Sequence, residues 1–210
     1  MKHSTPYGPK EFSESEKVSP DTLARLKAFA DLLVAWNAKI NLVSKSTIPD
    51  LWHRHILDSA QIYPLLPRDY STLIDLGSGA GFPGLILSIM GAPGVHLIES
   101  DARKSAFLRE AIRVTGASAK VLNVRIEDAP TLKADVITAR ALAPLSELLR
   151  YSAPFWGSKT TCFFLKGQHV GVELTDAHKM WRMTTETRPS RSDPGGTVVC
   201  VSEVRHVSAS

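Results

Sequence analysis

Residues 72–84 read TLIDLGSGAGFPG, an apolar run followed by a turn that contains four glycines. The apolar run favours a strand, and the stretch from Leu85 to Met90 after the turn favours a helix. A strand, a glycine-rich turn and a helix in this order are typical of the first βα unit of a doubly wound sheet, where such folds bind ligands. Glycines let the backbone turn sharply and let a ligand approach without meeting a Cβ atom.

Short apolar runs alternate with helical segments in the rest of the chain. The further strands that we predict are VHLIE at 95–99, KVLNV at 120–124, DVITA at 135–139, TCFFLK at 161–166 and TVVCVSEV at 197–204. One intervening helix is expected from Arg103 to Thr115, closed by Gly116. This alternation predicts an α/β fold with a mostly parallel sheet and helices on both faces. The last run follows the turn signal DPGG at 193–196, so we expect it to pair antiparallel with an earlier strand.

The region before these strands lacks strand signals. Residues 1–18 are rich in Ser, Glu, Lys and Pro without periodic apolar positions, which predicts a flexible tail. Ser19 followed by Pro20 is typical of a helix start, and this helix is expected to end near Asn37. A second helical segment is expected to begin at Thr47. The predicted organisation is a flexible tail, then a helical N-terminal cap over residues 19–70, then a sheet domain over residues 71–207.

Composition places the chain among ordinary globular proteins. It has 210 residues, of which 43% are apolar, and a net charge of +4. No apolar run reaches the roughly 18 residues of a membrane span, and the first residues contain no secretory signal, so we expect a cytoplasmic protein. Cys162 and Cys200 fall in predicted strands, where free cysteines behave as small hydrophobic side chains, and we expect no disulfide. The positive charge weakly favours a polyanionic partner such as nucleic acid.

Two carboxylates accompany the glycine turn. Asp75 lies two residues before Gly77, where a dinucleotide site favours an apolar residue. S-adenosylmethionine carries an ammonium and a sulfonium group, which a nearby carboxylate favours. Glu99 closes the second predicted strand and is suited to accept both ribose hydroxyls, a spacing that fits NAD as well, so a nicotinamide dehydrogenase stays open here. The cofactor contacts that we predict from these residues are Asp75, Gly77, Gly79, Gly81 and Glu99.

Five motifs occur in order along the chain. They are WNAKINLVS at 36–44, RHILDS at 54–59, DLGSGAGFPG at 75–84, ARA at 139–141 and LKG at 165–167. In this order and at these separations they resemble the family of bacterial guanine-N(7) methyltransferases of small-subunit ribosomal RNA called RsmG or GidB. The resemblance implies a class I, Rossmann-like methyltransferase fold with a helical N-terminal extension and S-adenosylmethionine as donor. It places cofactor contacts at Gly77, Phe82, Ile126, Glu127 and Arg140.

The resemblance also implies a partner and a chemistry. The expected partner is small-subunit (16S) ribosomal RNA, free or in a ribosomal subunit, and the chain is expected to be a monomer. Guanine N(7) carries no proton, so methyl transfer to it needs no general base, and we predict no catalytic His or Cys. A donor on N(7) would occupy the attacking lone pair, so we expect Arg140 to orient the cofactor or a backbone phosphate. Lys166 ends a strand on the same rim and is a second candidate for positioning or phosphate contact.

A polar group on the second helical segment has two interpretations. Arg54 and His55 are RNA-binding candidates, but with Asp58 they could instead dock the helices onto the sheet, which we favour. His53 and His55 lie two residues apart on a helix and point to different faces, so no metal site is predicted.

The end of the chain departs from the family pattern. Members often carry an Arg-His pair before the last strand, where residues 195–197 here read GGT. Any RNA contact made by that pair is therefore in question, and Arg188, Arg191 and Arg205 are the candidates to replace it. The functions left open are a class I methyltransferase for another RNA, a protein or a small molecule, and a binding module without catalysis.

Overall fold

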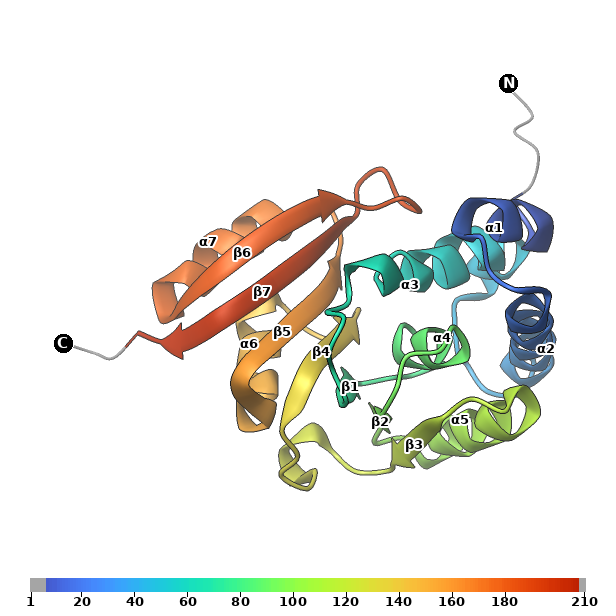
Figure 1. Ribbon diagram of the computed structural model, residues 1–210, viewed down its shortest axis with the longest axis horizontal. Helices are drawn as coiled ribbons and strands as arrows, with labels where there is room; N and C mark the ends of the chain where they lie inside the picture. The colour runs from blue at the N-terminus through green and yellow to red at the C-terminus, as the bar shows by residue number, and fades with distance from the viewer. Residues whose placement is uncertain (1–6, 208–210) are drawn as a thin grey trace.

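A seven-stranded sheet forms the centre of the computed structural model, which describes residues 7–207 (Figure 1). The strands are β1 (Leu73–Leu76), β2 (Val95–Ile98), β3 (Ala119–Leu122), β4 (Ala134–Arg140), β5 (Trp156–Lys166), β6 (Trp181–Pro189) and β7 (Thr197–His206). They lie in the order β3-β2-β1-β4-β5-β7-β6. The strands from β3 to β5 in this order are parallel, and β7 is antiparallel to β5 and β6. The predicted mostly parallel sheet with an antiparallel terminal strand is confirmed.

The order of the strands reverses at β1. This strand pairs with β2 on one side and with β4 on the other, so the chain builds the sheet outward in both directions from it. Open α/β sheets bind ligands beyond the carboxyl ends of their strands at such a point. The glycine turn follows Leu76, the last residue of β1, and so lies where the topology favours a binding site.

Helices cover both faces of the sheet. They are α1 (Pro9–Glu16), α2 (Pro20–Asn37), α3 (Asp58–Ala60), α4 (Gly84–Ile89), α5 (Ala102–Thr115), α6 (Leu145–Ser152) and α7 (Val170–Met180). Leu33 of α2, Leu85 of α4 and Phe107 of α5 share one buried cluster, and Leu148 of α6 and Ala177 of α7 belong to another on the opposite face. In Figure 1 the N-terminal helices gather beside α4 and α5, whereas α6 and α7 accompany β5, β6 and β7.

The second predicted helical segment is irregular. The described residues contain five short 3₁₀ or π-helical turns: η1 (Lys45–Asp50), η2 (Trp52–Leu57), η3 (Tyr63–Leu65), η4 (Ile126–Asp128) and η5 (Ala153–Phe155). Of these, η1 is a 3₁₀ turn and η2 is a π-helical turn that runs directly into α3. Wide π-helical turns are rare and are found frequently at functional sites. The RHILDS motif therefore lies on a distorted helix.

Helix boundaries follow the capping signals. The Ser19 hydroxyl accepts a hydrogen bond from the Thr22 amide (3.1 Å), and α2 runs from Pro20 to Asn37 as predicted. The predicted helix over 103–115 is α5, which begins one residue earlier because Asp101 caps it. Gly116 closes α5 with φ of +62°, a left-handed conformation that glycine adopts without strain.

The prediction of a flexible tail over residues 1–18 is wrong where the structure describes it. Pro9–Glu16 form the helix α1, and the Phe12 side chain is fully buried against Trp52, with ring centroids 5.5 Å apart. Glu16 forms two hydrogen bonds with the Arg191 guanidinium, at 2.6 and 2.9 Å. One buried aromatic side chain and one bidentate ion pair, both to distant segments, order a sequence with little apolar periodicity. Residues 1–6 of the predicted tail lie outside the described residues.

One strand was not predicted. Strand β6 forms the edge of the sheet, where its residues alternate between buried or half-buried and exposed positions from Trp181 to Thr185. Its sequence, WRMTTETRP, is largely polar because an edge strand contacts its neighbours on one side only. None of the helices within residues 7–207 has the length and apolar content needed to cross a membrane.

Candidate active site

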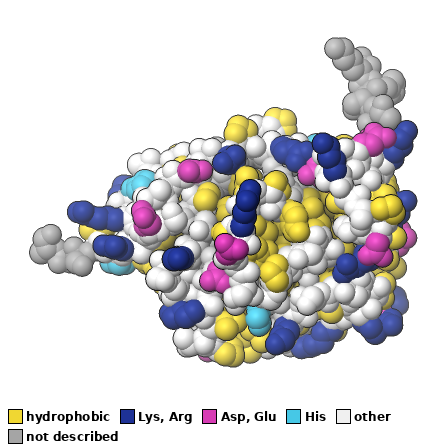
Figure 2. Space-filling model, viewed as in Figure 1, with side chains coloured by type: hydrophobic (Ala, Val, Ile, Leu, Met, Phe, Trp, Pro, Cys, Tyr) yellow, Lys and Arg dark blue, Asp and Glu magenta, His cyan; other side chains and the backbone are white. Residues whose placement is uncertain are grey.

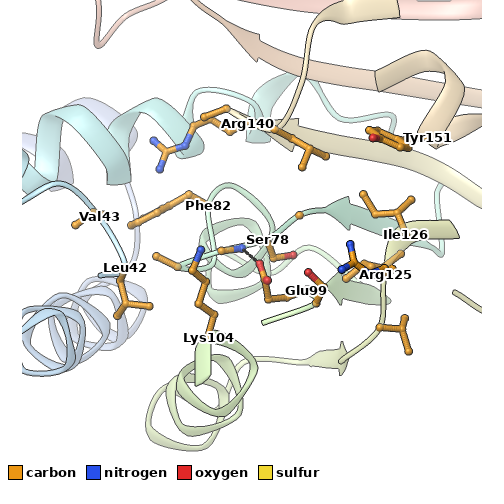
Figure 3. A pocket seen from close by; sticks show the side chains of 18 of the residues that line it. Leu42, Val43, Ser78, Phe82, Glu99, Lys104, Arg125, Ile126, Arg140 and Tyr151 are labelled. Atoms are coloured by element: carbon orange, nitrogen blue, oxygen red, sulfur yellow. Dashed lines mark hydrogen bonds between the residues drawn. The ribbon is translucent and has the colours of Figure 1, made fainter. Parts of the chain in front are cut away.

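A cavity of about 460 Å³ lies at the carboxyl ends of β1, β2 and β4 (Figure 3). Its walls come from the glycine turn after β1, the residues after β2 and β3, the loop after β4, and the loop after α2. The lining residues used below are Leu42, Val43, Gly77, Ser78, Gly79, Phe82, Glu99, Lys104, Arg125, Ile126, Glu127, Arg140, Ala141, Leu142 and Tyr151. We call it the first cavity. It brings together seven of the nine predicted cofactor residues, namely Gly77, Gly79, Phe82, Glu99, Ile126, Glu127 and Arg140.

Two glycines shape one wall of the first cavity. Gly77 has φ of +63°, and a Cβ atom there would lie 2.7 Å from Cδ1 of Leu142. Gly79 has φ of +55°, and a Cβ atom there would meet nothing nearer than the Gly77 carbonyl oxygen at 3.8 Å. A side chain at Gly79 would therefore extend into space that the turn leaves free. Both backbone conformations are ones that residues with side chains rarely adopt.

The Glu99 carboxylate is held by backbone amides. Its Oε2 atom accepts from the Gly79 amide (2.8 Å) and its Oε1 atom accepts from the Asp101 amide (2.7 Å). The residue is 7% exposed, and that exposure faces the first cavity. Each carboxylate oxygen can accept a second hydrogen bond. Glu99 thus lies where the sequence predicted it, with capacity left for two hydroxyl donors.

The positions of Asp75 and Gly81 require a correction, because neither lines the first cavity. Asp75 is fully buried; Thr138 Oγ1 donates to its Oδ1 atom (2.6 Å), and a Cβ atom on Gly84 would lie 2.5 Å from its Cβ atom. Asp75 therefore lies beneath the turn, between β1, β4 and the start of α4, rather than facing a cationic ligand. Burial raises the pKa of Asp75 to about 6.

Gly81 is needed for packing. It has φ of +93°, and a Cβ atom there would lie 2.9 Å from the Leu85 Cβ atom and 3.3 Å from Leu108 Cδ2. The glycine thus lets the turn pack closely on α4 and α5. Sequence alone could not separate this role from ligand contact, because both require the absence of a side chain.

Arg140, the last residue of β4, joins the sheet to the RHILDS motif. Its Nη1 atom donates to Asp58 Oδ2 (3.1 Å) and to the Arg54 carbonyl oxygen (3.3 Å), and its Nη2 atom donates to His55 Nδ1 (3.0 Å). The Arg140 guanidinium also lies over the Phe82 ring, 4.6 Å from its centroid. This arrangement agrees with the favoured interpretation that the motif docks the helices onto the sheet.

Lys166, a predicted candidate for positioning or phosphate contact, lines the second cavity described below and is paired within the protein. Its side chain is 9% exposed, its Nζ atom lies 2.6 Å from Glu173 Oε2, and it donates to the Ala143 carbonyl oxygen at 2.8 Å. The same Glu173 atom accepts from the Leu145 amide (2.8 Å). The ammonium group therefore links the loop after β4 to α7. Its charge is paired with Glu173 and one of its N–H groups donates to Ala143.

A second cavity of about 450 Å³ adjoins the first. Leu42, Val43, Arg140 and Ala141 line both. The rest of its wall comes from three segments that are distant in sequence: Thr47, Arg54, His55 and Asp58; Leu165, Lys166 and Gly167; and Ser190, Ser192, Asp193, Gly196 and Thr197.

Hydrogen bonds hold the last of these segments, the β6–β7 loop over residues 190–196, against the helices. Asp58 Oδ1 accepts from the Ser192 hydroxyl (2.6 Å), and Gln61 Oε1 accepts from the Arg191 amide (2.9 Å). Arg54, which is 44% exposed, lies 3.3 Å from Asp193 Oδ2. The β6–β7 loop thereby forms the outer wall of the second cavity.

Several lining residues were missed from the sequence. Lys104 lies in the first turn of α5, where a cation is disfavoured by the helix dipole, and this signal could have marked it as functional. Arg125 and Tyr151 carried no comparable signal. Leu42 and Val43 follow α2, and their amides donate to Asn37 Oδ1 at 2.8 and 3.0 Å. Their place at the cavities depends on how α2 packs on α5 (Figure 3).

Neither histidine of the RHILDS region takes part in a metal cluster. Within residues 7–207, no group of three or more His, Cys, Asp or Glu side chains is placed to hold a metal ion. His53 lies 3.7 Å from Asp50, whereas His55 contacts Arg140. Cys162 and Cys200 are both free thiols.

Comparison with known proteins supplies the family. The family model GidB, described as rRNA small subunit methyltransferase G, matches residues 22–192. The chain belongs to this family.

Relatives extend the match to nearly the whole chain. Ribosomal RNA small subunit methyltransferase G of Paramagnetospirillum magneticum is 54% identical over 197 residues, which cover 94% of this chain and 96% of the relative. The protein of the same name from Rhodospirillum centenum is 52% identical over 194 residues, which cover 92% and 90%. In each comparison the match therefore covers at least nine tenths of both proteins.

Solved structures of low identity share the fold. M. jannaschii TYW2 in complex with AdoMet aligns with a TM-score of 0.58 at 16% identity, over 81% of this chain and 80% of that one. A SAM dependent methyltransferase from Aquifex aeolicus aligns with a TM-score of 0.56 at 18% identity, over 73% and 93%. The predicted class I methyltransferase fold is confirmed.

Proposed function

We propose that this member of the GidB family transfers a methyl group from S-adenosylmethionine to N(7) of a guanine in small-subunit ribosomal RNA. One observation carries the proposal: two cavities adjoin on the carboxyl edge of the sheet and share Leu42, Val43, Arg140 and Ala141 in their walls. Both volumes fall in the range of about 300 to 1,000 Å³ that small-molecule sites occupy. Membership in the GidB family of rRNA small subunit methyltransferases supports the same chemistry.

The residues of the first cavity fit an adenosyl cofactor. Glu99 presents two oxygens that still have accepting capacity, as a ribose diol requires, and Gly79 leaves room for close approach. Ile126 offers an apolar side chain for a flat base, and Glu127 follows it. When bound, S-adenosylmethionine supplies the electrophilic methyl group.

The protein's own residues have to align the reacting groups and to tolerate the positive charge of the methylated base. The target nitrogen has a free lone pair and no proton, so no side chain has to remove one. Arg140 stands where the cavities meet, but Asp58 accepts its hydrogen bond at 3.1 Å and offsets its charge. The junction therefore does not oppose the positive charge that the methylated base acquires. We infer that the second cavity receives the target nucleotide.

The approach of a polyanion is compatible with the surface. Figure 2 shows lysine and arginine side chains spread over this face, at its margin and near its centre, among hydrophobic side chains and fewer acidic ones. The net charge of +4 adds a general attraction to RNA that falls with salt. Arg54, at the mouth of the second cavity and 44% exposed, is the best-placed cation for a phosphate contact.

The decisive experiment is methyl transfer from labelled S-adenosylmethionine to small-subunit ribosomal RNA, offered naked and as assembled subunits. The expected result is label in at least one form, which mapping places on a single N(7)-methylguanine. Label on another base, on ribosomal protein or on no substrate would overturn the proposal. Thermal shift compares cofactors: we expect stabilisation by S-adenosylhomocysteine and none by NAD, because only a ligand of the native state raises the melting temperature.

We also propose three broader properties. The chain acts as a monomer, since each cavity is complete within one chain. It acts in the cytoplasm, where its proposed substrate is found. Residues 19–70 serve as a helical cap on a catalytic domain over residues 71–207, since this region supplies Leu42, Val43 and the RHILDS motif to the walls of the cavities. Light scattering of the purified protein tests the first property directly.

A further inference from the structure

The hydrogen bonds of His55 define its protonation. A guanidinium group only donates, so the 3.0 Å contact between Arg140 Nη2 and His55 Nδ1 makes Nδ1 an acceptor. The proton of the neutral ring must then lie on Nε2, which donates to Thr47 Oγ1 at 2.8 Å. Thr47 in turn donates to the Ser44 carbonyl oxygen at 2.8 Å. Every donor in this series of hydrogen bonds has an acceptor. A second proton on His55 would have to bind Nδ1, where it would point at an N–H group of Arg140.

The ring of His55 is also fixed by packing. It stacks on Phe82, with centroids 5.1 Å apart and planes inclined by 22°, and Phe82 is itself 3% exposed. Arg140 lies over the same Phe82 ring. Burial and the guanidinium groups of Arg140 and Arg54 lower the pKa of His55 to about 3. The charged groups around the ring are these two arginines and Asp58, so with a neutral ring the two positive charges are partly offset by one negative charge.

We propose that His55 is a positioning residue for methyl transfer: as a neutral Nε2–H tautomer it works with Asp58 to fix Arg140 where the two cavities meet. This inference rests on the proposed function. Three N–H bonds of the guanidinium donate to Asp58, Arg54 and His55, and the other two, on Nε and Nη2, have no hydrogen-bond partner among residues 7–207. A charged histidine would add a further cation to Arg140 and Arg54 beside a base that becomes positive, whereas the neutral ring orients Arg140 without that penalty.

Two substitutions separate the two ring nitrogens. His55→Asn puts an amide oxygen near the position of Nδ1 and keeps an acceptor for Arg140. His55→Gln puts its amide near Nε2, which keeps the Thr47 contact and leaves the Arg140 N–H without a partner. The matched control is His53→Asn on the same turn, since His53 contacts Asp50 and the Tyr7 ring but neither cavity.

The kinetic test measures kcat and KM for RNA with each variant, together with melting temperature and S-adenosylhomocysteine affinity. We expect His55→Asn and His53→Asn to stay within about threefold of wild type. His55→Gln should lower kcat about 10- to 100-fold, the usual effect of losing a hydrogen bond to a charged group, with KM nearly unchanged. Equal losses in both His55 variants, or a loss confined to KM or melting temperature, would indicate docking alone and overturn the inference.

A measurement on the wild-type protein does not depend on turnover. Long-range ¹H–¹⁵N NMR of labelled histidine distinguishes the two neutral tautomers and the charged ring. We expect the neutral Nε2–H tautomer of His55 to persist from about pH 5 to pH 8, the interval in which an ordinary histidine titrates. A charged ring or an Nδ1–H tautomer in that interval would overturn the inference even if the proposed RNA substrate were correct. Conversely, absence of RNA labelling with this tautomer present would count against the proposed function only.

Discussion

The two cavities on the carboxyl edge of the sheet are assembled in different ways. The first takes most of its wall from the segments directly after β1, β2, β3 and β4, so each contributor follows a recognisable strand. The second takes its wall from residues 42–58, 140–141, 165–167 and 190–197, which meet only through long-range contacts. A cavity made at strand ends can be predicted from sequence signals, whereas one made from distant loops depends on how helices and loops dock.

The largest effect should come from Lys166, which supports the second cavity. Lys166→Ala leaves the Glu173 carboxylate half-buried without its cation, and breaking such a pair costs about 3 to 5 kcal/mol of unfolding free energy. Urea denaturation measures this loss. Lys179→Ala removes an exposed pair with Asp176 and is the control, with an expected loss of less than about 1 kcal/mol. A stable Lys166→Ala protein with weaker, less salt-dependent RNA binding would restore the phosphate role predicted from sequence.

Asp75, beneath the first cavity, should make stability depend on pH. Burial raises its pKa from the usual 3.8 to about 6 in the folded protein, so its contribution to stability is fully present below pH 3.8 and is lost as pH rises through 6. We expect wild type to lose about 3 kcal/mol relative to Asp75→Asn between about pH 4 and pH 8. Denaturation of both proteins across this interval tests the sign. A constant difference would show that the Asp75 carboxylate is solvated or paired.

Glu99 should affect ligand binding at the first cavity. Glu99→Gln places an amide N–H group against one of the two backbone N–H groups that the carboxylate accepts from, and it removes the negative charge of the acceptor. S-adenosylhomocysteine should therefore bind about 30- to 100-fold more weakly. Isothermal titration calorimetry gives the affinity. The control, Glu110→Gln, alters a surface pair with Arg113 on α5 and should leave affinity unchanged. Equal affinities for Glu99→Gln and wild type would remove the carboxylate from the cofactor site.

The smallest effect should follow from Glu16, which anchors α1 to the β6–β7 loop. In the bidentate contact with Arg191 the Glu16 side chain is 6% exposed and the Arg191 side chain 47% exposed. Glu16→Gln keeps one oxygen as an acceptor for the guanidinium, so the loss should be about 1 kcal/mol of unfolding free energy. Because the loop walls the second cavity only, we expect weaker RNA binding with unchanged S-adenosylhomocysteine affinity. An equal change in both affinities would mean that the two cavities are not separable.

The sequence by itself determined the first half of this picture. The run TLIDL with its glycine turn, the carboxylate at Glu99 and the alternation of apolar runs specified a doubly wound sheet and the place of its site, because each signal acts over a few neighbouring residues. The bounds of the predicted strands differ from the structure by at most two residues, except that β5 begins five residues earlier, and the antiparallel pairing of β7 followed from a turn signal. These features need no knowledge of distant contacts.

Tertiary structure decided which side chains are free to act. Lys166 and Asp75 lie in predicted strands, yet Glu173 on the following helix and Thr138, 63 positions after Asp75, bind their charged groups within the protein. The helix Pro9–Glu16 is held in place by the burial of Phe12 and by the hydrogen bond of Glu16 with Arg191, which lies 175 positions later in the chain. Burial and pairing depend on contacts across the chain, which local patterns do not encode. The glycine turn could therefore be predicted from its own residues, whereas the partners of Arg140 could not.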